Sequence, residues 1–115
     1  MQMRVLLALE EAARRKEVAS AFEGHRAHFL VRSVDPQEMT LEATRFQPHL
    51  VVCGAAAGPL VAPTAWARVH LFTHGGLPVA IVQVGQSYRW VENVGVEDLL
   101  AIADEVEEHV FGEGR

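Results

Sequence analysis

The amino-acid sequence predicts an α/β fold in which a mainly parallel β-sheet is covered by helices on both faces. The first observation is that short, almost continuous apolar runs, such as residues 3–9 and 49–53, are typical of strands buried on both sides. The second is that helix-like segments with start and stop signals alternate with these runs. This alternation predicts right-handed crossovers, three layers and the sheet order 2-1-3-4.

The first part of the chain is expected to contain two strands joined by one helix. Residues 3–9 form the first strand, and a helix follows over residues 10–23. Its apolar positions, at loose helical spacing, are Ala12, Ala13, Val18, Ala19 and Phe22. Gly24 is a suitable stop because glycine adopts a positive φ at little cost. Residues 27–33 then form the second strand.

The second helix has the clearest start signal in the chain. Asp35 is placed to cap free backbone amides, Pro36 suits the first helical position, and Glu38 is placed to reach back to the cap amide. Pro48 ends this helix because the residue before a proline disfavours helical geometry. The third strand is therefore expected at residues 49–53.

A further helix and strand are expected after the third strand. Residues 54–58, Gly-Ala-Ala-Ala-Gly, turn the chain, and a helix beginning at Pro63 is expected over residues 63–73. The pair Gly75–Gly76 ends this helix, and residues 77–84 form the fourth strand. Because a helix precedes that strand, we expect it to be parallel to the third.

Residues 88–92 are unusual because only three residues separate them from the expected fourth strand. A parallel neighbour needs a crossover of about a dozen residues or more. If this segment is a strand, it must be antiparallel and lie at the edge of the flavodoxin-like sheet, where a covering helix is missing. The last helix is expected at residues 96–111, and this acidic helix should share a sheet face with the basic first helix.

Composition sets limits on function and location. The 115 residues fit one domain, expected over residues 1–111 with a frayed tail at 112–115. A net charge of −5 argues against direct binding of nucleic acid, and the basic cluster Arg14–Arg15–Lys16 is expected to form a solvated helix face. The single cysteine, Cys53, excludes an internal disulfide and is expected to be a small buried hydrophobe. No apolar segment is long enough for a bilayer, and the N-terminus does not read as a signal peptide, so we expect a cytoplasmic location and no membrane partner.

Four stretches of the sequence resemble the receiver domain of bacterial two-component response regulators. Residues 4–11 resemble its first strand with the paired acidic residues that follow, and residues 47–54 resemble its third strand. Residues 77–82 resemble its fourth strand, and residues 88–106 resemble its fifth strand and last helix. The resemblance covers nearly the whole chain through the order and spacing of these stretches.

The departures from this family fall on its chemistry. The aspartate that accepts a phosphoryl group at the end of the third strand is matched here by Gly54, which has no side chain. The hydroxyl residue after the fourth strand has no match at residues 83–85, and the lysine of the fifth strand falls at about Glu92. The resemblance thus implies a pseudo-receiver: a non-enzymatic, phosphorylation-incompetent signalling domain that needs no cofactor and acts by binding a partner protein or itself.

A weak cation or anion site is an alternative at the carboxyl ends of the strands, where ligands bind in such sheets. Its candidate residues are Glu10, Glu11, Gly54, Gly58 and Glu92. The same acids also suit the first turn of a helix, where the dipole favours negative charge. His70 and His74 are four residues apart, but no third ligand accompanies them, so we predict no metal site. The alternative function is therefore a small-molecule or anion-binding domain.

Aromatic residues form the candidate interface, because such side chains are enriched at the centres of interfaces. They are Trp66, Phe72, Tyr88 and Trp90. With a covering helix missing, an apolar patch should be exposed beside residues 88–92 unless the helix at residues 63–73 shifts to cover it. We therefore expect a homodimer, formed by pairing of this edge strand or by helix packing.

Overall fold

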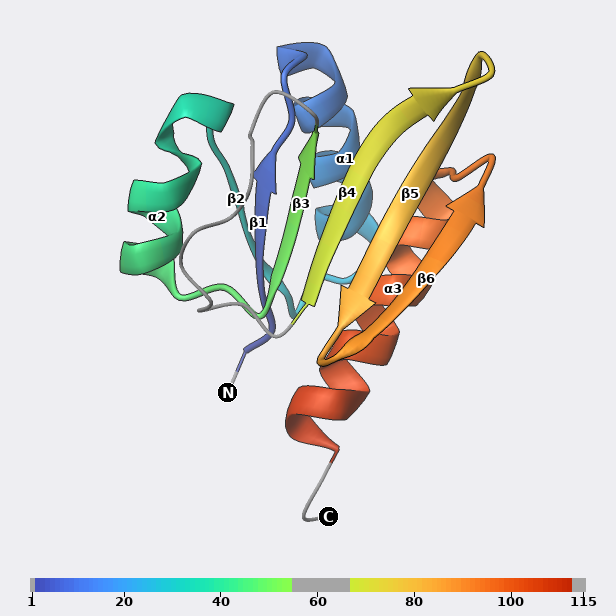
Figure 1. The fold of residues 1–115 in the computed structure, drawn as a ribbon. Helices are drawn as coiled ribbons and strands as arrows, with labels where there is room; N and C mark the ends of the chain where they lie inside the picture. Colours follow the sequence, from blue (N-terminus) through green and yellow to red (C-terminus); the bar gives the residue numbers. More distant parts are fainter. Residues whose placement is uncertain (1, 55–66, 113–115) are drawn as a thin grey trace.

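The computed structural model describes residues 2–54 and 67–112 of the chain. Six strands form one sheet in the order β2-β1-β3-β4-β5-β6 (Figure 1). In chain order the elements are β1 (Arg4–Ala8), α1 (Ala12–His25), β2 (Leu30–Ser33), a 3₁₀ turn (Pro36–Glu38), α2 (Met39–Phe46), β3 (Leu50–Gly54), β4 (Ala67–His74), β5 (Leu77–Val84), β6 (Ser87–Glu92) and α3 (Val96–Phe111).

The sheet is parallel on one side and antiparallel on the other. Strand β1 pairs in parallel with β2 and β3, and β3 pairs in parallel with β4. Strand β5 is antiparallel to β4, and β6 is antiparallel to β5. The predicted α/β class, the order beginning 2-1-3-4 and the antiparallel edge strand at residues 88–92 are confirmed.

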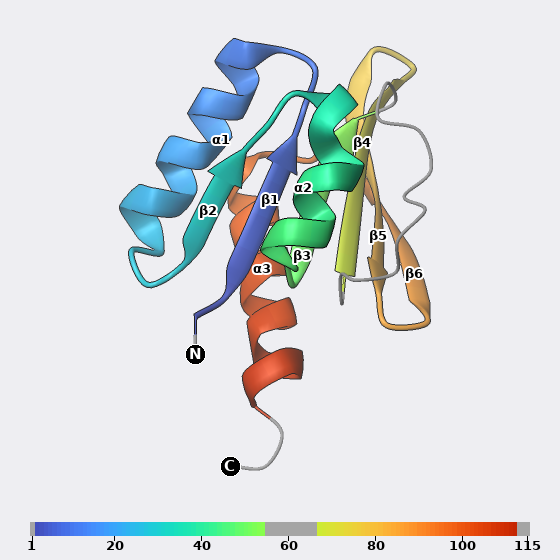
Figure 2. The same ribbon diagram turned by 90° about the vertical axis from the view of Figure 1, so that its left-hand side faces the viewer.

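Helices lie on both faces of the sheet (Figure 2). Helices α1 and α3 cover one face, and their buried side chains join those of the central strands in the larger core; Val18, Phe22, Leu99 and Val106 are examples. Helix α2 covers the opposite face over β1 and β3, where Met39 and Ala43 pack against Leu6 and Val51. Within the described residues, no helix lies over β4, β5 and β6 on the α2 side.

Local signals account for several helix ends. The Asp35 carboxylate accepts a hydrogen bond from the Gln37 amide at 3.3 Å, as the predicted cap requires, although the first residues after it form a 3₁₀ turn before α2 begins. Helix α2 ends in the left-handed Gln47, one residue before Pro48. At the start of α3, the Asp98 carboxylate accepts from the Gly95 amide at 2.8 Å.

The prediction of a helix over residues 63–73 is wrong for residues 67–73, the part that the structure describes. Residues 67–74 form β4, and residues 63–66 lie outside the described part. In this strand Ala67, Val69 and Leu71 are buried in the larger core, while the residues between them face the other side. An alternation with period two is the signature of a strand, and it prevails over the helical start suggested by Pro63.

Strand β5 is consequently antiparallel rather than the predicted parallel fourth strand. Gly75 and Gly76 have φ values of 61° and 80° and form a two-residue turn between β4 and β5. Such a turn needs positive φ at its central residues and can only join antiparallel strands. The glycine pair was interpreted as a helix stop, whereas it is the centre of a hairpin.

The basic first helix and the acidic last helix lie on the same sheet face, as predicted. The Arg26 guanidinium, just after α1, donates two hydrogen bonds to the Asp104 carboxylate, at 2.7 and 2.6 Å. This hydrogen bonding is the main reason that the pKa of Arg26 is raised. His28 and Glu107 make a second contact at 2.9 Å. No helix in the described ranges has the length and apolar character needed to cross a bilayer.

His49 is a buried histidine between β1 and β3. Its Nδ1 atom accepts a hydrogen bond from the Arg4 backbone amide at 2.9 Å, and its ring stands edge-on to Phe111 with 5.0 Å between ring centres. Burial, assisted by the charge of Arg4, lowers the pKa of His49. The neutral ring therefore serves the packing of the strand ends.

Candidate functional site

Gly54 lies at the carboxyl end of β3, where the sequence predicted the vacant acceptor position. It pairs with Leu71 of β4, and a Cβ atom added to it would lie 3.5 Å from the Glu10 Oε1 atom. The structure thus brings Gly54 and Glu10 together at one edge of the sheet. No carboxylate originates from the end of β3 itself, because the residue there is glycine.

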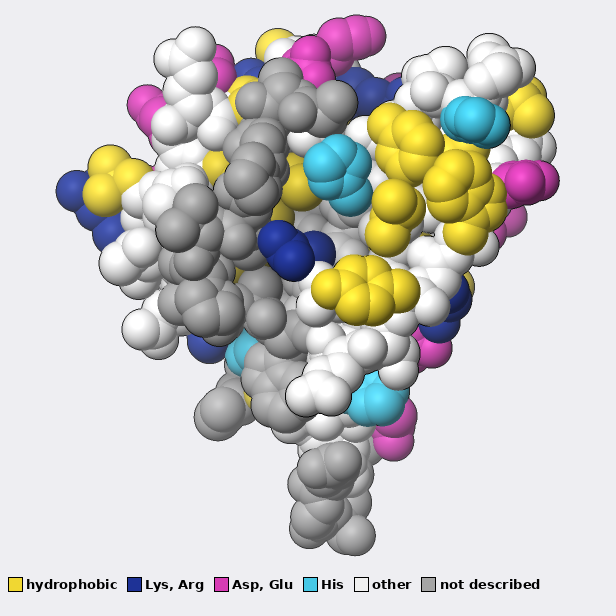
Figure 3. All heavy atoms as spheres, viewed as in Figure 1, with side chains coloured by type: hydrophobic (Ala, Val, Ile, Leu, Met, Phe, Trp, Pro, Cys, Tyr) yellow, Lys and Arg dark blue, Asp and Glu magenta, His cyan; other side chains and the backbone are white. Residues whose placement is uncertain are grey.

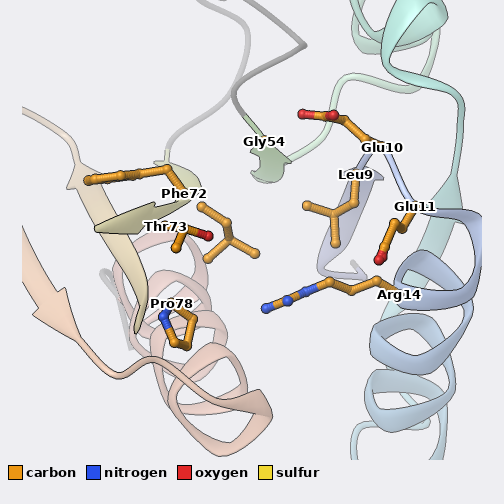
Figure 4. A pocket seen from close by; sticks show the side chains of 9 residues that line it. Leu9, Glu10, Glu11, Arg14, Gly54, Phe72, Thr73 and Pro78 are labelled. Atoms are coloured by element: carbon orange, nitrogen blue, oxygen red, sulfur yellow. The ribbon is translucent and has the colours of Figure 1, made fainter. Parts of the chain in front are cut away.

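A cavity of about 430 Å³ opens at this edge, beside the carboxyl ends of β1, β3 and β4 (Figure 4). Its lining residues are Leu9, Glu10, Glu11, Arg14, Gly54, Leu71, Phe72, Thr73 and Pro78. Leucine, phenylalanine and proline supply apolar walls; the two carboxylates come from the segment joining β1 to α1, and Arg14 comes from the first turn of α1. Clefts at the carboxyl ends of strands are the usual ligand sites in α/β sheets.

Arg14 supplies the positive charge of this cavity. Its guanidinium extends into the opening on the side of Thr73 and Pro78 (Figure 4). Within the described residues, Arg14 makes no hydrogen bond or ion pair with another side chain. The neighbouring Arg15 is different, since it donates to the Leu9 carbonyl oxygen at 2.6 Å. One of the three basic residues that the sequence assigned to a solvated helix face therefore lines the cavity.

Not every predicted site residue reaches this edge. Glu10, Glu11 and Gly54 line the cavity, whereas Glu92 at the end of β6 does not. Gly58 lies outside the described residues. Among the residues that the structure describes, no group of three or more histidine, cysteine, aspartate or glutamate side chains is placed to hold a metal ion. The predicted set is thus split: Glu10, Glu11 and Gly54 line the cavity together with Arg14, which was not predicted.

Because residues 67–74 form a strand and not the predicted helix, two of the positions compared with a receiver domain change their place in the sheet. The hydroxyl residue was sought at residues 83–85, but the strand before them is β5 and is antiparallel. The fourth place in the sheet belongs to β4, and Thr73 near its end lines the cavity. Glu92 belongs to the sixth strand and not to a parallel fifth one. Gly54 keeps its predicted place at the end of a strand, so the interpretation as a pseudo-receiver depends on this residue.

On the α2 side, strands β4, β5 and β6 carry a cluster of aromatic and aliphatic side chains, which we call the aromatic face (Figure 3). It consists of His70, Phe72 and His74 on β4, Leu77 and Ile81 on β5, and Tyr88 and Trp90 on β6. The Trp90 ring stands edge-on to Phe72 and His74, with 5.4 and 5.8 Å between ring centres. Three of the four predicted interface residues, Phe72, Tyr88 and Trp90, thus share this face, and Trp66 lies outside the described residues.

Tyr88 and Trp90 are strongly exposed for aromatic side chains. Their exposed fractions are 66% and 48%. His70 and His74 were expected on one side of a helix and instead share a side of β4, because both spacings bring residues four apart to one face. They flank Phe72, and their rings stand edge-on to Phe72 and Trp90.

Cys53 behaves as the sequence predicted. It is buried in the smaller core beneath α2, and burial raises the pKa of its thiol. A protonated thiol in an apolar core is a poor nucleophile. Cys53 therefore contributes packing and not chemistry.

Sequence reasoning missed Arg14, Leu71 and Thr73 as cavity residues. Arg14 was assigned to the solvent, and the other two were assigned to a helix. The two-residue glycine turn at 75–76, flanked by runs of strand-forming residues, was the signal that could have placed β4 in the sheet.

Comparisons with known proteins identify no family. No protein-family model and no curated protein sequence matches this chain. Among solved structures, a match covers 99% of this chain and 79% of protein VC0702 from Vibrio cholerae, with 17% sequence identity and a TM-score of 0.36. Similarity at this level carries no argument about function.

Proposed function

We propose that this protein is a non-enzymatic, receiver-like association module that acts in regulation by binding a partner protein, in the first place a second copy of itself. The observation that carries the proposal is the aromatic face, which no described helix covers. A cytoplasmic location and the absence of phosphoryl chemistry are part of the same proposal.

The composition of the aromatic face supports association. Aromatic side chains are enriched at the centres of protein interfaces, and contiguous apolar patches on a monomer usually mark binding sites. Other exposed large hydrophobic residues, Leu30 on β2 and Leu41 on α2, lie on different elements. By contrast, Leu77, Ile81, Tyr88 and Trp90 gather on neighbouring strands of one sheet face.

Gly54 supports the absence of phosphoryl transfer. A receiver needs a carboxylate at the end of its third strand to accept the phosphoryl group, and β3 ends in glycine. Glu10 lies close by, but it comes from the end of β1 and has a longer side chain. We thus interpret the protein as a receiver-like sheet that has glycine where a receiver has its phosphoryl-accepting aspartate.

Two measurements test the proposal. Light scattering across a dilution series is expected to show a dimer that dissociates to monomers, and a strict monomer at high concentration would contradict self-association. Mass spectrometry after incubation with acetyl phosphate and Mg²⁺ is expected to show no added mass. A phosphorylated adduct would contradict the loss of acceptor chemistry.

The cavity favours a second candidate function, the binding of a small molecule with an anionic group. Its apolar walls suit a hydrocarbon body, and Arg14 is placed to receive a carboxylate or phosphate. Glu10 and Glu11 oppose a highly charged anion by repulsion. A singly charged amphipathic carboxylate fits this balance better than a polyphosphate.

The second candidate predicts ligand-induced stabilisation that depends on two cavity residues. A thermal-shift screen of organic carboxylates, nucleotides and inorganic phosphate is expected to yield a shift with a carboxylate that Arg14→Gln abolishes and Gly54→Leu reduces. Lys16→Gln is the matched control, because Lys16 is exposed on the same helix and does not line the cavity. A shift that survives Arg14→Gln would rule out this mode of binding.

A further inference from the structure

Strand β6 forms the outer edge of the sheet, and its turn determines which backbone groups face outward. Gly85, with a φ of 61°, and Gln86 form a two-residue turn between Val84 and Ser87. In such a hairpin the two residues that flank the turn exchange backbone hydrogen bonds with each other. Beyond them, non-hydrogen-bonded and hydrogen-bonded pairs alternate along the two strands. Strand β6 therefore directs the N–H and C=O groups of Ser87, Arg89 and Val91 toward β5.

The alternate residues of β6 direct their backbone groups away from the sheet. They are Tyr88, Trp90 and Glu92. The hydrogen bond from the Val94 amide to the Pro78 carbonyl oxygen, at 3.0 Å, agrees with this alternation, because Pro78 then faces the β6 side. In the described parts of the chain, no backbone group pairs with this edge.

We propose that two copies of the chain join their β6 strands in an antiparallel pair about a two-fold axis perpendicular to the sheet, with Trp90 opposite the partner's Trp90. This inference rests on the proposed function and names its geometry. The two sheets become continuous, and their aromatic faces lie side by side on the same surface. Pairing of two equivalent edges is self-complementary and closes at a dimer.

The alignment of the two β6 strands follows from the backbone groups that face outward and from the charges of the side chains. With Trp90 on the axis, Tyr88 lies opposite the partner's Glu92, and all three outward residues form hydrogen-bonded pairs, about six backbone hydrogen bonds. A shift of two residues in one direction places Arg89 opposite the partner's Arg89, where like charges repel. The opposite shift centres the pair on Val91 and leaves Tyr88 without a strand partner. A shift by a single residue would pair side chains from opposite faces.

Side chains on both faces fit this register. On the aromatic face, the partner's Glu92 carboxylate lies across from the Tyr88 phenol, which is a suitable donor. On the opposite face, Arg89 lies across from the partner's Val91 and keeps its ion pair with Glu105, 2.9 Å apart in the monomer. The strand also lacks the lysine, proline or bulge with which natural proteins block a free edge.

Cysteine cross-linking between two different variants tests the register. Tyr88→Cys and Glu92→Cys are made separately in a Cys53→Ala background, which removes the native thiol. Cα atoms of a hydrogen-bonded antiparallel pair are about 5.5 Å apart, within the range of a disulfide. An equimolar mixture is expected to form disulfide-linked dimers at least tenfold faster than either variant alone. Equal rates in the mixture and the single variants would overturn the register.

A proline substitution tests whether the edge itself is used. Tyr88→Pro and Tyr88→Ala both remove the ring, but only proline removes the outward N–H, and neither change touches the ladder to β5. The dissociation constant is expected to be at least tenfold higher for Tyr88→Pro than for Tyr88→Ala. Equal constants would overturn edge pairing.

The outcomes also separate this inference from the function on which it rests. A dimer in light scattering without mixed cross-links means that the copies associate by another surface, such as two aromatic faces packed together, and it refutes the edge pairing alone. A monomer at every concentration refutes both the pairing and self-association.

Discussion

Replacement of Trp90 by alanine is expected to raise the dissociation constant of the dimer by about 100-fold, which is about 3 kcal/mol. Trp90 is 48% exposed, stands edge-on to Phe72 and His74, and lies at the centre of the proposed pairing of two β6 strands. Removal of a central aromatic side chain costs about 2–4 kcal/mol at many interfaces. Because half of the ring is already exposed, the monomer should lose only about 1 kcal/mol of stability.

Leu41→Ala is the matched control for Trp90→Ala. Leu41 is 54% exposed, a value close to that of Trp90, but it lies on α2, away from β6. The control should therefore leave the dissociation constant within about twofold of the wild-type value. Sedimentation or light scattering over a dilution series measures both variants. If Trp90→Ala associates as tightly as the wild type, Trp90 does not lie at the interface.

The second large effect is on folding: Phe22→Ala is expected to lower the free energy of unfolding by about 3–5 kcal/mol. Phe22 is 1% exposed in the core between α1 and the sheet, with its ring centre 6.2 Å from that of Phe29. Val18 and Phe22 are the buried residues of α1, so the attachment of this helix depends on few side chains. A loss of this size is a large part of the stability of a small domain.

Urea denaturation tests this prediction, with Phe22→Leu and Lys16→Ala as controls. Leucine fills much of the space of the ring, so Phe22→Leu should lose about 1 kcal/mol. Lys16 is exposed on the same helix, and its replacement should change stability by less than about 0.5 kcal/mol. A loss of less than about 1.5 kcal/mol for Phe22→Ala would show that α1 packs more loosely than this core requires.

The first half of the fold could be predicted because its local and tertiary signals agree. The apolar runs that became β1 and β3 are buried on both faces, and the helix cap at Asp35 operates as expected. Gly54 could likewise be placed at a strand end, because it follows an apolar run that the structure shows as a strand buried throughout.

The second half was harder because its signals conflict. The sequence around β4 contains a proline that favours a helix start and a glycine pair that favours a helix stop, but the alternation of Val69, His70 and Leu71 favours a strand. Proline and glycine at the ends of a segment do not specify whether its middle is a helix or a strand. The spacing of the buried residues along the segment does specify this. The cavity was missed for the same reason, since Thr73 reaches it only as part of a strand.

The sequence by itself determined the α/β class, the place of Gly54 at the end of a strand and the antiparallel course of residues 88–92, because each follows from local chain chemistry or from the length of a connection. Only the tertiary structure decided that β4 lies between β3 and β5, that Arg14 lines a cavity, and that Phe72, Tyr88 and Trp90 share one face of the sheet. These relations join residues far apart in the chain, and the pairing of strands, which no local pattern encodes, brings them together.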